Sequence, residues 1–366
     1  MSTDLKESLV LEEIPVPGYE RVVKITDLDS GLIAIICLHN LSLGPALGGT
    51  RIYPYATFEE ALTDAKRLAR GMTYKSAIIE AGLGGGKSVI IADAKTQKSE
   101  AKLLAFGQAV ERLEGSYICA EDYGCTPKDA LVIRQKTRYI VGLPMEKSSG
   151  DPGSFTAHGT LKGIQTALKK VYGSDSCEGK TIAIQGLGSV GSRLAELLFW
   201  EGARLIISDI DQTKARDIGR ACQAEVVSPG EILSASCDLL APCALGGILN
   251  AETIPQLRCR AIAGCANNQL LTDADGEELM RHGILYAPDF VINAGGLINV
   301  AEELHCEGYS PIRSRNKVNK IYDQLMLIYE IAEKNQISTH AAALSLGDYR
   351  LKYGVGRRTT PLHFHH

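Results

Sequence analysis

Residues 71 to 93, which read GMTYKSAIIEAGLGGGKSVIIAD, predict a helix end, a glycine-rich turn and a buried strand. Upstream, apolar residues recur at helical spacing, and Thr57 with Glu60 three positions later is typical of an N-cap and its capping box. Downstream, SVIIA is typical of a short buried strand. This arrangement places Lys75 near a helix C-terminus and Lys87 at the mouth of a strand.

The two lysines are candidates for a ligand-binding site. Most lysines are solvated surface residues, but Lys87 lies between three successive glycines and an apolar strand, where backbone and ligand can approach closely. The letters GGGKS also match the end of a phosphate-binding loop. Such a loop requires a glycine where this chain has Ala81, so the spacing excludes it.

Composition narrows the class of protein. At 366 residues the chain exceeds the length at which a single hydrophobic core keeps growing, which favours two domains. A net charge of −4 without a long basic run predicts no nucleic-acid partner. We find no secretory signal and no apolar run of membrane-spanning length, so we expect a cytoplasmic protein without membrane contact. The ten cysteines form no CxxC pair, which predicts reduced, buried thiols and no metal site.

The first half of the chain is expected to contain a β-hairpin and a carboxylate pair. The runs RVVKITD and GLIAIICLHN form the hairpin, and GPALGGTRIYP after them is a glycine-rich segment at the edge of a cleft. A helix over residues 100 to 113 leads into the strand SYICA, which ends at Glu121 and Asp122. A further helix begins near Thr126 and runs towards Arg138.

The segment KTIAIQGLGSVGSRLAELLFWEGARLIISDID, residues 180 to 211, carries a dinucleotide-binding fingerprint in its full strand, helix and strand context. Gly186 permits the tight turn, Gly188 lets a pyrophosphate approach the backbone, and Gly191 allows close helix packing. The helix N-terminus attracts the phosphate charge. Asp209 is suited to accept hydrogen bonds from the ribose hydroxyls and to repel a 2′-phosphate, which favours NAD over NADP.

Further short strands at CDLLAPCA, AIAGCANN and ILYAPD alternate with helices and predict a doubly wound α/β domain of the Rossmann type. Gly142 to Gly153 is rich in proline and serine and is interpreted as a linker. We therefore place the first domain at 1 to 148 and the second at 149 to 330. Late helices, with the chain from about 331 to 366, are expected to pack back on the first domain.

With these segments identified, the chain resembles the leucine dehydrogenase branch of the Glu/Leu/Phe/Val amino-acid dehydrogenase superfamily. The resemblance covers nearly the whole chain and is carried by GPALGGTR, ARGMTYK, GGGK, AED, GLGSVG, APCALGG and PDFVINAGGLINV. It implies an N-terminal α/β catalytic domain, a Rossmann NAD-binding domain and an active site in the cleft between them. It also implies a homo-oligomer.

The resemblance assigns roles by position. It implies that Lys75 binds the substrate α-carboxylate, that Lys87 is the catalytic lysine, and that Asp122 handles protons on the amino group and the attacking water. Gly48 and Gly49 would shape the carboxylate site. The other implied substrate-binding residues are Leu47, Ala120, Asn268, Leu297 and Val300. The implied cofactor-binding residues are Gly186, Gly188, Ser189, Val190, Gly191, Asp209, Thr156 and Asn293.

The implied activity is the reversible, NAD-dependent conversion of a branched-chain L-amino acid into its 2-oxo acid and ammonia. The resemblance implies an apolar side-chain pocket, which would exclude glutamate because its γ-carboxylate would be left unpaired there. Leucine is favoured, with valine and isoleucine also accepted. Because Glu80 and Leu297 depart from the pattern of that branch, a phenylalanine or tryptophan dehydrogenase is an alternative. An NAD-binding regulatory protein without catalysis is an alternative of another class.

Overall fold

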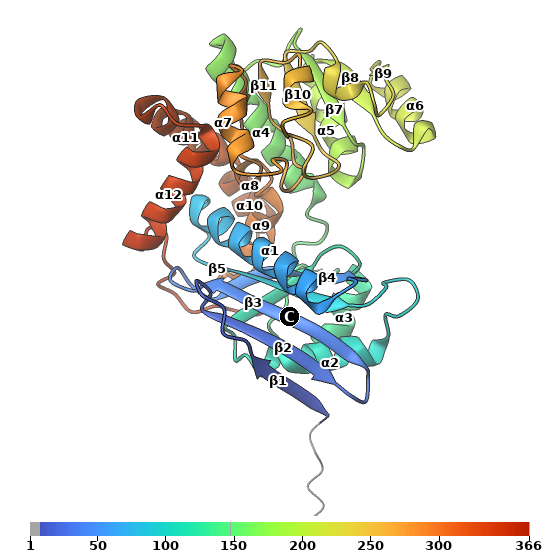
Figure 1. Cartoon of the computed structure of the whole chain (residues 1–366), viewed down its shortest axis with the longest axis vertical. Helices are drawn as coiled ribbons and strands as arrows, with labels where there is room; N and C mark the ends of the chain where they lie inside the picture. The colour runs from blue at the N-terminus through green and yellow to red at the C-terminus, as the bar shows by residue number, and fades with distance from the viewer. Residues whose placement is uncertain (1–7, 147, 366) are drawn as a thin grey trace, which may run out of the picture. The chain divides into compact units, whose positions relative to one another are not determined.

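The computed structural model describes residues 8–146 and 148–365, and the chain divides into two compact units (Figure 1). Unit 1 runs to Asp151 and also includes Val300–Ser310 and the C-terminal segment from Arg350. Unit 2 comprises Pro152–Asn299 and Pro311–Tyr349. The division after Asp151 lies three residues beyond the boundary expected from the sequence. The return to unit 1 differs from the expectation more clearly, since most of the last helix belongs to unit 2.

Unit 1 is built on a six-stranded mixed sheet in the order β1-β2-β3-β5-β4-β6. The predicted hairpin is confirmed, since the second and third strands pair antiparallel. The fourth strand is parallel to both of its neighbours. The first strand was not predicted. The strands are β1 (Leu9–Glu13), β2 (Arg21–Asp27), β3 (Leu32–Asn40), β4 (Ala46–Tyr53), β5 (Gly84–Ile91) and β6 (Tyr117–Glu121).

Helices cover both faces of this sheet. Helix α1 (Phe58–Ile78) packs its alanine-rich face on one side, where Ile35 and Val89 point. Helices α2 (Glu100–Glu111) and α3 (Pro127–Arg134) cover the other side (Figure 1). The strands therefore bury alternate residues in two different cores, as the period of two along a strand requires. Thr57 caps α1 as predicted, but the Glu60 carboxylate accepts from the N–H of Ala56.

Two segments that the sequence favoured as glycine-rich loops are strands. Gly48 and Gly49 lie within β4, and the triple glycine before Lys87 is the first part of β5. The glycines are required by close packing: a Cβ on Gly85 would overlap the backbone nitrogen of Thr73 in α1. A Cβ on Gly48 would likewise overlap the carbonyl oxygen of Gly86. Helix α1 thus approaches the backbone of β5 directly.

Unit 2 has a parallel six-stranded sheet in the order β12-β11-β10-β7-β8-β9, and the predicted doubly wound fold is confirmed. The order reverses at the central strand that precedes the glycine fingerprint, and ligands bind at such points in open α/β sheets. The strands are β7 (Thr181–Gln185), β8 (Arg204–Ser208), β9 (Glu225–Val226), β10 (Leu239–Pro242), β11 (Ala261–Ile262) and β12 (Leu285–Tyr286).

Helices of unit 2 flank this sheet, as the alternation of strands and helices in the sequence predicts. Among the late helices, the two that cover Pro311–Asn319 and Ile321–Asn335 meet at Lys320. The helices are α4 (Gly153–Tyr172), α5 (Ser189–Trp200), α6 (Gln212–Ala221), α7 (Ala274–Arg281), α8 (Asp289–Ile292), α9 (Gly295–Ala301), α10 (Pro311–Asn319), α11 (Ile321–Asn335) and α12 (Thr339–Tyr353). Across the described residues, none of the helices is long and apolar enough to span a membrane.

The C-terminal segment closes the end of α1 in unit 1. The buried guanidinium of Arg350 donates to the carbonyl oxygens of Ala77 and Ile78, which a helix end leaves without an intrahelical partner. Its other nitrogen lies 3.2 Å from a carboxylate oxygen of Glu80. Arg358 donates to the Gly82 carbonyl at 3.0 Å. Glu80, at which the sequence departs from the family pattern, therefore holds the arginine that caps the helix bearing Lys75.

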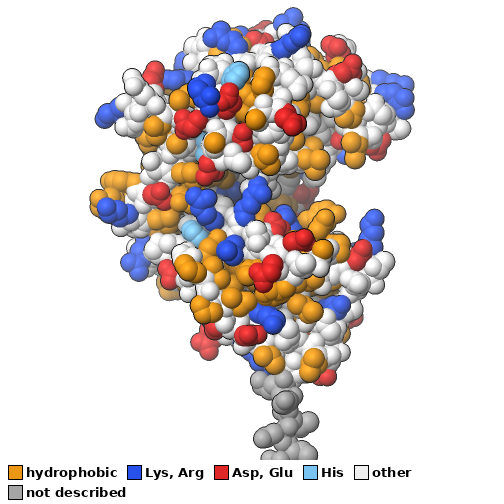
Figure 2. All heavy atoms as spheres, in the orientation of Figure 1, with side chains coloured by type: hydrophobic (Ala, Val, Ile, Leu, Met, Phe, Trp, Pro, Cys, Tyr) orange, Lys and Arg blue, Asp and Glu red, His pale blue; other side chains and the backbone are white. Residues whose placement is uncertain are grey.

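Charge is dispersed over the molecular surface. Figure 2 shows lysine and arginine side chains interspersed with aspartate and glutamate on the face it presents. This mixture matches the small net charge of −4. On that face, no broad basic area of the kind that tracks a nucleic-acid backbone is formed.

We expect Gly85→Ala and Gly71→Ala to change stability in opposite directions. The first places a methyl group against the backbone of Thr73 and should lower the free energy of unfolding by about 1–3 kcal/mol. The second fills open space within α1 and should raise it by about 0.5–1 kcal/mol. Midpoints of thermal unfolding for the two variants measure this. Equal midpoints would contradict the close approach of α1 to β5.

Candidate active site

Three of the predicted motifs meet at one place in unit 1. Strand β4 lies between β5 and β6, and Gly49 on β4 is opposite Ala120 on β6. A Cβ on Gly49 would lie 2.8 Å from the Cβ of Asp122 and 3.2 Å from Lys87 Nζ. Because Gly49 has no side chain, the lysine of β5 and the aspartate after β6 can meet across the strand between them.

Lys87 and Asp122 form a close ion pair. Lys87 Nζ donates to Asp122 Oδ2 at 2.7 Å. The Lys87 side chain is 8% exposed, whereas the Asp122 side chain keeps 26% of its surface accessible. A buried ammonium is tolerated only with a charged or hydrogen-bonding partner. The structure thus pairs the two residues, with Asp122 as the more accessible member.

Arg51 is a third charged member that the sequence did not single out. Its Nε donates to the same Asp122 oxygen at 3.2 Å. Burial alone would raise the pKa of Asp122, but the positive charges of Lys87 and Arg51 outweigh burial and lower it to about 2. Arg51 ends the motif GPALGGTR, so its position two residues after Gly49 on the same strand was the available signal.

Glu121, the other carboxylate of the predicted pair, has a different environment. Burial raises its pKa, and the negative charges of Asp151 and Asp122 raise it further. The pKa of its neighbour Asp122 is lowered instead, by the positive charges of Lys87 and Arg51. The two adjacent carboxyl groups at this strand end therefore have pKa values shifted in opposite directions, and Asp122 is the one that contacts Lys87.

A buried hydroxyl cluster supports this part of the sheet. Tyr117 Oη lies 2.9 Å from both the Gly48 carbonyl and Ser88 Oγ. Ser88 in turn donates to Thr50 Oγ1 at 3.0 Å. Tyr117, Ser88 and Thr50 are each fully buried, so every bond is made away from water. The cluster holds the carbonyl of Gly48 in place and was not predicted.

The other predicted substrate residues are divided between the units. Lys75 is half-buried in the last turn of α1, as predicted. Leu47 is buried beside Gly48, and Ala120 is partly buried. Val300 is buried in unit 1. Asn268 and Leu297 belong to unit 2.

The glycine fingerprint of unit 2 has the local form that a dinucleotide requires. Gly186 has φ +91°, which favours glycine, and a Cβ on Gly191 would overlap the carbonyl of Gly186. A Cβ on Gly188 would meet nothing within 4 Å, so this backbone faces open space at the start of α5. Ser189 and Val190 form the first turn of that helix. Asp209 Oδ2 accepts from the N–H of Leu187 at 2.6 Å.

Asn293 and Thr156 are also ordered in unit 2. Asn293 is 6% exposed, and its Nδ2 donates to Asn267 Oδ1 at 2.7 Å. Within the described residues, Asn293 Oδ1 is buried without a hydrogen-bond partner. Thr156 Oγ1 donates to the Pro152 carbonyl at 3.0 Å. An orphaned buried acceptor is a feature that a bound ligand with an N–H group would satisfy.

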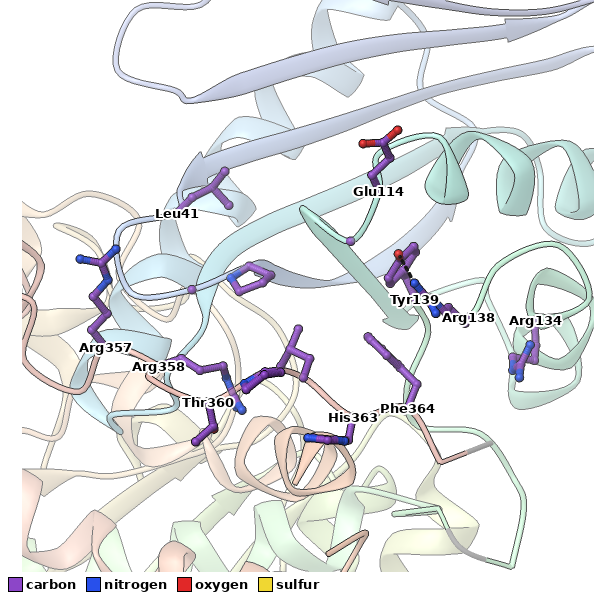
Figure 3. A pocket seen from close by; sticks show the side chains of 15 residues that line it. Leu41, Glu114, Arg134, Arg138, Tyr139, Arg357, Arg358, Thr360, His363 and Phe364 are labelled. Atoms are coloured by element: carbon purple, nitrogen blue, oxygen red, sulfur yellow. Dashed lines mark hydrogen bonds between the residues drawn. The ribbon is translucent and has the colours of Figure 1, made fainter. Parts of the chain in front are cut away.

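A separate pocket in unit 1 does not involve these residues. It has a volume of about 700 Å³ and lies between the loop before β4, the end of α3 and the C-terminal segment (Figure 3). Arg134, Arg138 and Arg358 are among its lining residues, whereas the predicted catalytic and substrate residues are not. In Figure 3 the labelled arginines do not converge on one point. The pocket therefore lacks the focused charge of an anion site.

Comparison with known proteins gives matches over most of the chain. The family model described as Glu/Leu/Phe/Val dehydrogenase, dimerisation domain, matches residues 19–139, and the model described as Glutamate/Leucine/Phenylalanine/Valine dehydrogenase matches residues 206–351. A leucine dehydrogenase of Thermoactinomyces intermedius is 47% identical over 93% of both chains. The crystal structure of an L-tryptophan dehydrogenase from Nostoc punctiforme has 43% identity and a TM-score of 0.81, covering 92% of this chain and 96% of that one.

Replacing Asp122 by asparagine should destabilise the protein in a pH-dependent way. The pKa of Asp122 is about 2 in the folded chain, against about 3.9 for an ordinary aspartate. Its ionised form therefore stabilises the fold above about pH 4, and this stabilisation is lost as the pH falls through about 2. We expect the midpoint of thermal unfolding of Asp122→Asn to lie below that of the wild type at pH 6, and the gap to close towards pH 2.

The exposed Asp217→Asn variant, in which no such gap is expected at any pH, serves as the control. A gap for Asp122→Asn that stays constant from pH 6 to pH 2 would contradict the ion pairing of Asp122.

Proposed function

Since the chain belongs to the Glu/Leu/Phe/Val dehydrogenase family and is an amino-acid dehydrogenase, we propose that it deaminates branched-chain L-amino acids oxidatively, with leucine preferred and NAD as the cofactor. The observation that carries this proposal is the buried Lys87 paired with Asp122 beside Gly49. The products are the 2-oxo acid and ammonia, and the reaction is reversible.

The reaction makes specific demands on the chain. When bound, NAD supplies the acceptor for the hydride that leaves Cα. The resulting iminium carbon must then be attacked by water, and the amino group must leave as ammonia, so protons must be removed and returned near the substrate nitrogen. These steps need a base and an acid that exchange protons with each other.

Lys87 and Asp122 meet that demand. We assign Lys87 as the base that activates the attacking water and Asp122 as the group that carries protons to and from the amino group. Their 2.7 Å separation lets a proton pass directly between them. The more accessible carboxylate of Asp122 can exchange protons onward, while the buried Lys87 is shielded from bulk water.

The remaining substrate residues bind and orient. Lys75 supplies a positive charge for the α-carboxylate, and Asn268 supplies an amide to the same group. Gly48 and Gly49 leave backbone rather than side chains facing the carboxylate. We assign the substrate side chain to Leu47, Ala120, Leu297 and Val300, all of which are apolar.

NAD is assigned to the fingerprint of unit 2. Gly188 leaves open backbone for the pyrophosphate at the N-terminus of α5, where the helix dipole favours negative charge. Asp209 lies beside this turn, hydrogen-bonded to Leu187, and its negative charge would repel a 2′-phosphate on a cofactor bound there. Asn293 and Thr156 would complete the site on the nicotinamide side.

The proposed substrate preference rests on the apolar residues assigned to the substrate side chain and on the sequence identities to known dehydrogenases. A γ-carboxylate buried against such side chains would be unpaired, so glutamate is excluded. The identity to a leucine dehydrogenase, 47%, exceeds the 43% shared with a tryptophan dehydrogenase and a phenylalanine dehydrogenase of Bacillus thermotolerans. Those two relatives make an aromatic amino acid the second candidate.

We also propose a homo-oligomer, because the model that matches residues 19–139 is described as a dimerisation domain.

The proposed function predicts NADH formation at alkaline pH with leucine, isoleucine and valine and none with glutamate. Lys87→Ala should lower kcat/KM by roughly 10²–10⁴-fold, because it removes the proton acceptor. Lys95→Ala, at an exposed lysine of the same unit, is the control and should match the wild type. A panel of the twenty amino acids measures the preference.

A preference for phenylalanine or tryptophan would instead support the second candidate. A protein that binds NADH yet is silent with every amino acid would contradict the enzymatic proposal and favour a regulatory one.

Asp209→Asn should weaken the discrimination between the two cofactors. The asparagine keeps an oxygen that can accept from Leu187 N–H but removes the charge that repels a 2′-phosphate. We expect kcat/KM for NAD to fall by roughly tenfold or more, as for loss of a charged hydrogen bond, while kcat/KM for NADP stays level or rises. An unchanged ratio of the two values would refute the assignment of Asp209 to the ribose.

A further inference from the structure

A line of polar side chains extends from the catalytic pair to α1. Arg51 on β4 donates from Nε to Asp122 Oδ2 at 3.2 Å and from Nη1 to Asp64 Oδ2 at 2.9 Å. Asp64, on α1, also accepts from Tyr55 Oη at 2.5 Å. Lys87 Nζ donates to the same oxygen of Asp122 at 2.7 Å. The guanidinium therefore bridges two carboxylates, only one of which contacts Lys87.

The geometry restricts both ends of the bridge. Arg51 and Asp64 are about three-quarters buried, with side-chain exposures of 25% and 27%. A planar guanidinium that donates through different nitrogens to two fixed acceptors is held in one orientation. Tyr55 adds a third hydrogen-bonding group at the remote end and fixes the Asp64 oxygen that Arg51 uses.

We propose that Arg51 is a positioning residue of the reaction: anchored by Asp64 and Tyr55, it holds Asp122 ionised and correctly oriented towards Lys87. This role rests on the proposed function, since it concerns the same catalytic pair. Arg51 itself need not touch the substrate. Its effect is exerted through Asp122 Oδ2, the oxygen that both cations share.

Electrostatics agree with this assignment. Burial opposes ionisation of Asp122, and Lys87 and Arg51 together overcome it. During turnover Lys87 must give up its proton, and at that stage Arg51 is the remaining positive charge bonded to Asp122. The charged and titratable groups around Asp122 are Lys87 on β5, Arg51 on β4, Glu121 and Tyr117 on β6, and Cys125 before α3.

The test compares Arg51→Gln with Arg51→Lys by pH profiles of kcat/KM for leucine and NAD. Without the cation, the acid limb of Arg51→Gln should move to higher pH by about one unit or more, and kcat/KM at neutral pH should fall at least tenfold. Arg51→Lys keeps the charge, so its acid limb should stay near that of the wild type although kcat falls. Tyr55→Phe should cause a smaller loss without a large shift.

Arg138→Gln, at an exposed arginine whose side chain bonds Tyr139, is the matched control and should leave the profile unchanged. An acid limb that is the same in Arg51→Gln as in the wild type would overturn the proposal. So would equal shifts in Arg51→Gln and Arg51→Lys, since these would indicate a role in packing rather than in charge.

A readout without activity separates this proposal from the proposed function. The measurement is the difference in unfolding midpoint between a protein that has Asp122 and one that carries Asp122→Asn. As the pH is lowered, this difference should vanish at a higher pH when Arg51→Gln is also present than when Arg51 is kept. If the wild type deaminated no amino acid, the proposed function would fail, and this cycle would still measure the action of Arg51 on Asp122. Gaps that close at the same pH in both backgrounds would count against Arg51.

Discussion

The ion pair between Lys87 and Asp122 is the interaction on which the arrangement of unit 1 depends. A lysine that is 6% exposed requires a charged partner, and the nearest carboxylate comes from a different strand. The two side chains can meet only because Gly49, on the strand between them, has no side chain. The same requirement for space explains why Gly48, Gly49 and the triple glycine before Lys87 lie within strands, although glycine weakens an isolated strand.

Around this pair, charged and polar side chains are buried together with their hydrogen-bonding partners. Arg51 bridges Asp122 and Asp64, and the hydroxyl groups of Tyr117 and Ser88 hold the backbone next to Gly48. Each of these side chains has a hydrogen-bonding partner, which restricts its orientation before a ligand binds. Preorganised charges of this kind stabilise proton transfer more effectively than mobile ones, because less reorganisation accompanies the reaction.

In unit 2, by contrast, the local sequence is nearly sufficient to predict the glycine fingerprint. Its fingerprint was predicted with its strand, turn and helix because Gly186, Gly191 and Asp209 act within about thirty residues of one another. The structure places the Asp209 carboxylate on the turn itself, through its bond to Leu187. Unit 1 has no such compact motif. Lys87 and Asp122 are 35 residues apart, and Arg51 and Asp122 are 71 apart.

The sequence alone determined the two-domain α/β class, the helix that ends near Lys75, the carboxylates at the end of β6 and the nucleotide fingerprint. Each depends on periodicity, caps or glycines close together in the chain. Only the tertiary structure decided that most of GPALGGTR and all of GGGK lie in strands, that Arg51 joins the pair of Lys87 and Asp122, and that Glu80 holds Arg350 at the end of α1. These features arise from contacts between distant segments, where packing overrides the low strand propensity of glycine and where charges find partners that no local pattern specifies.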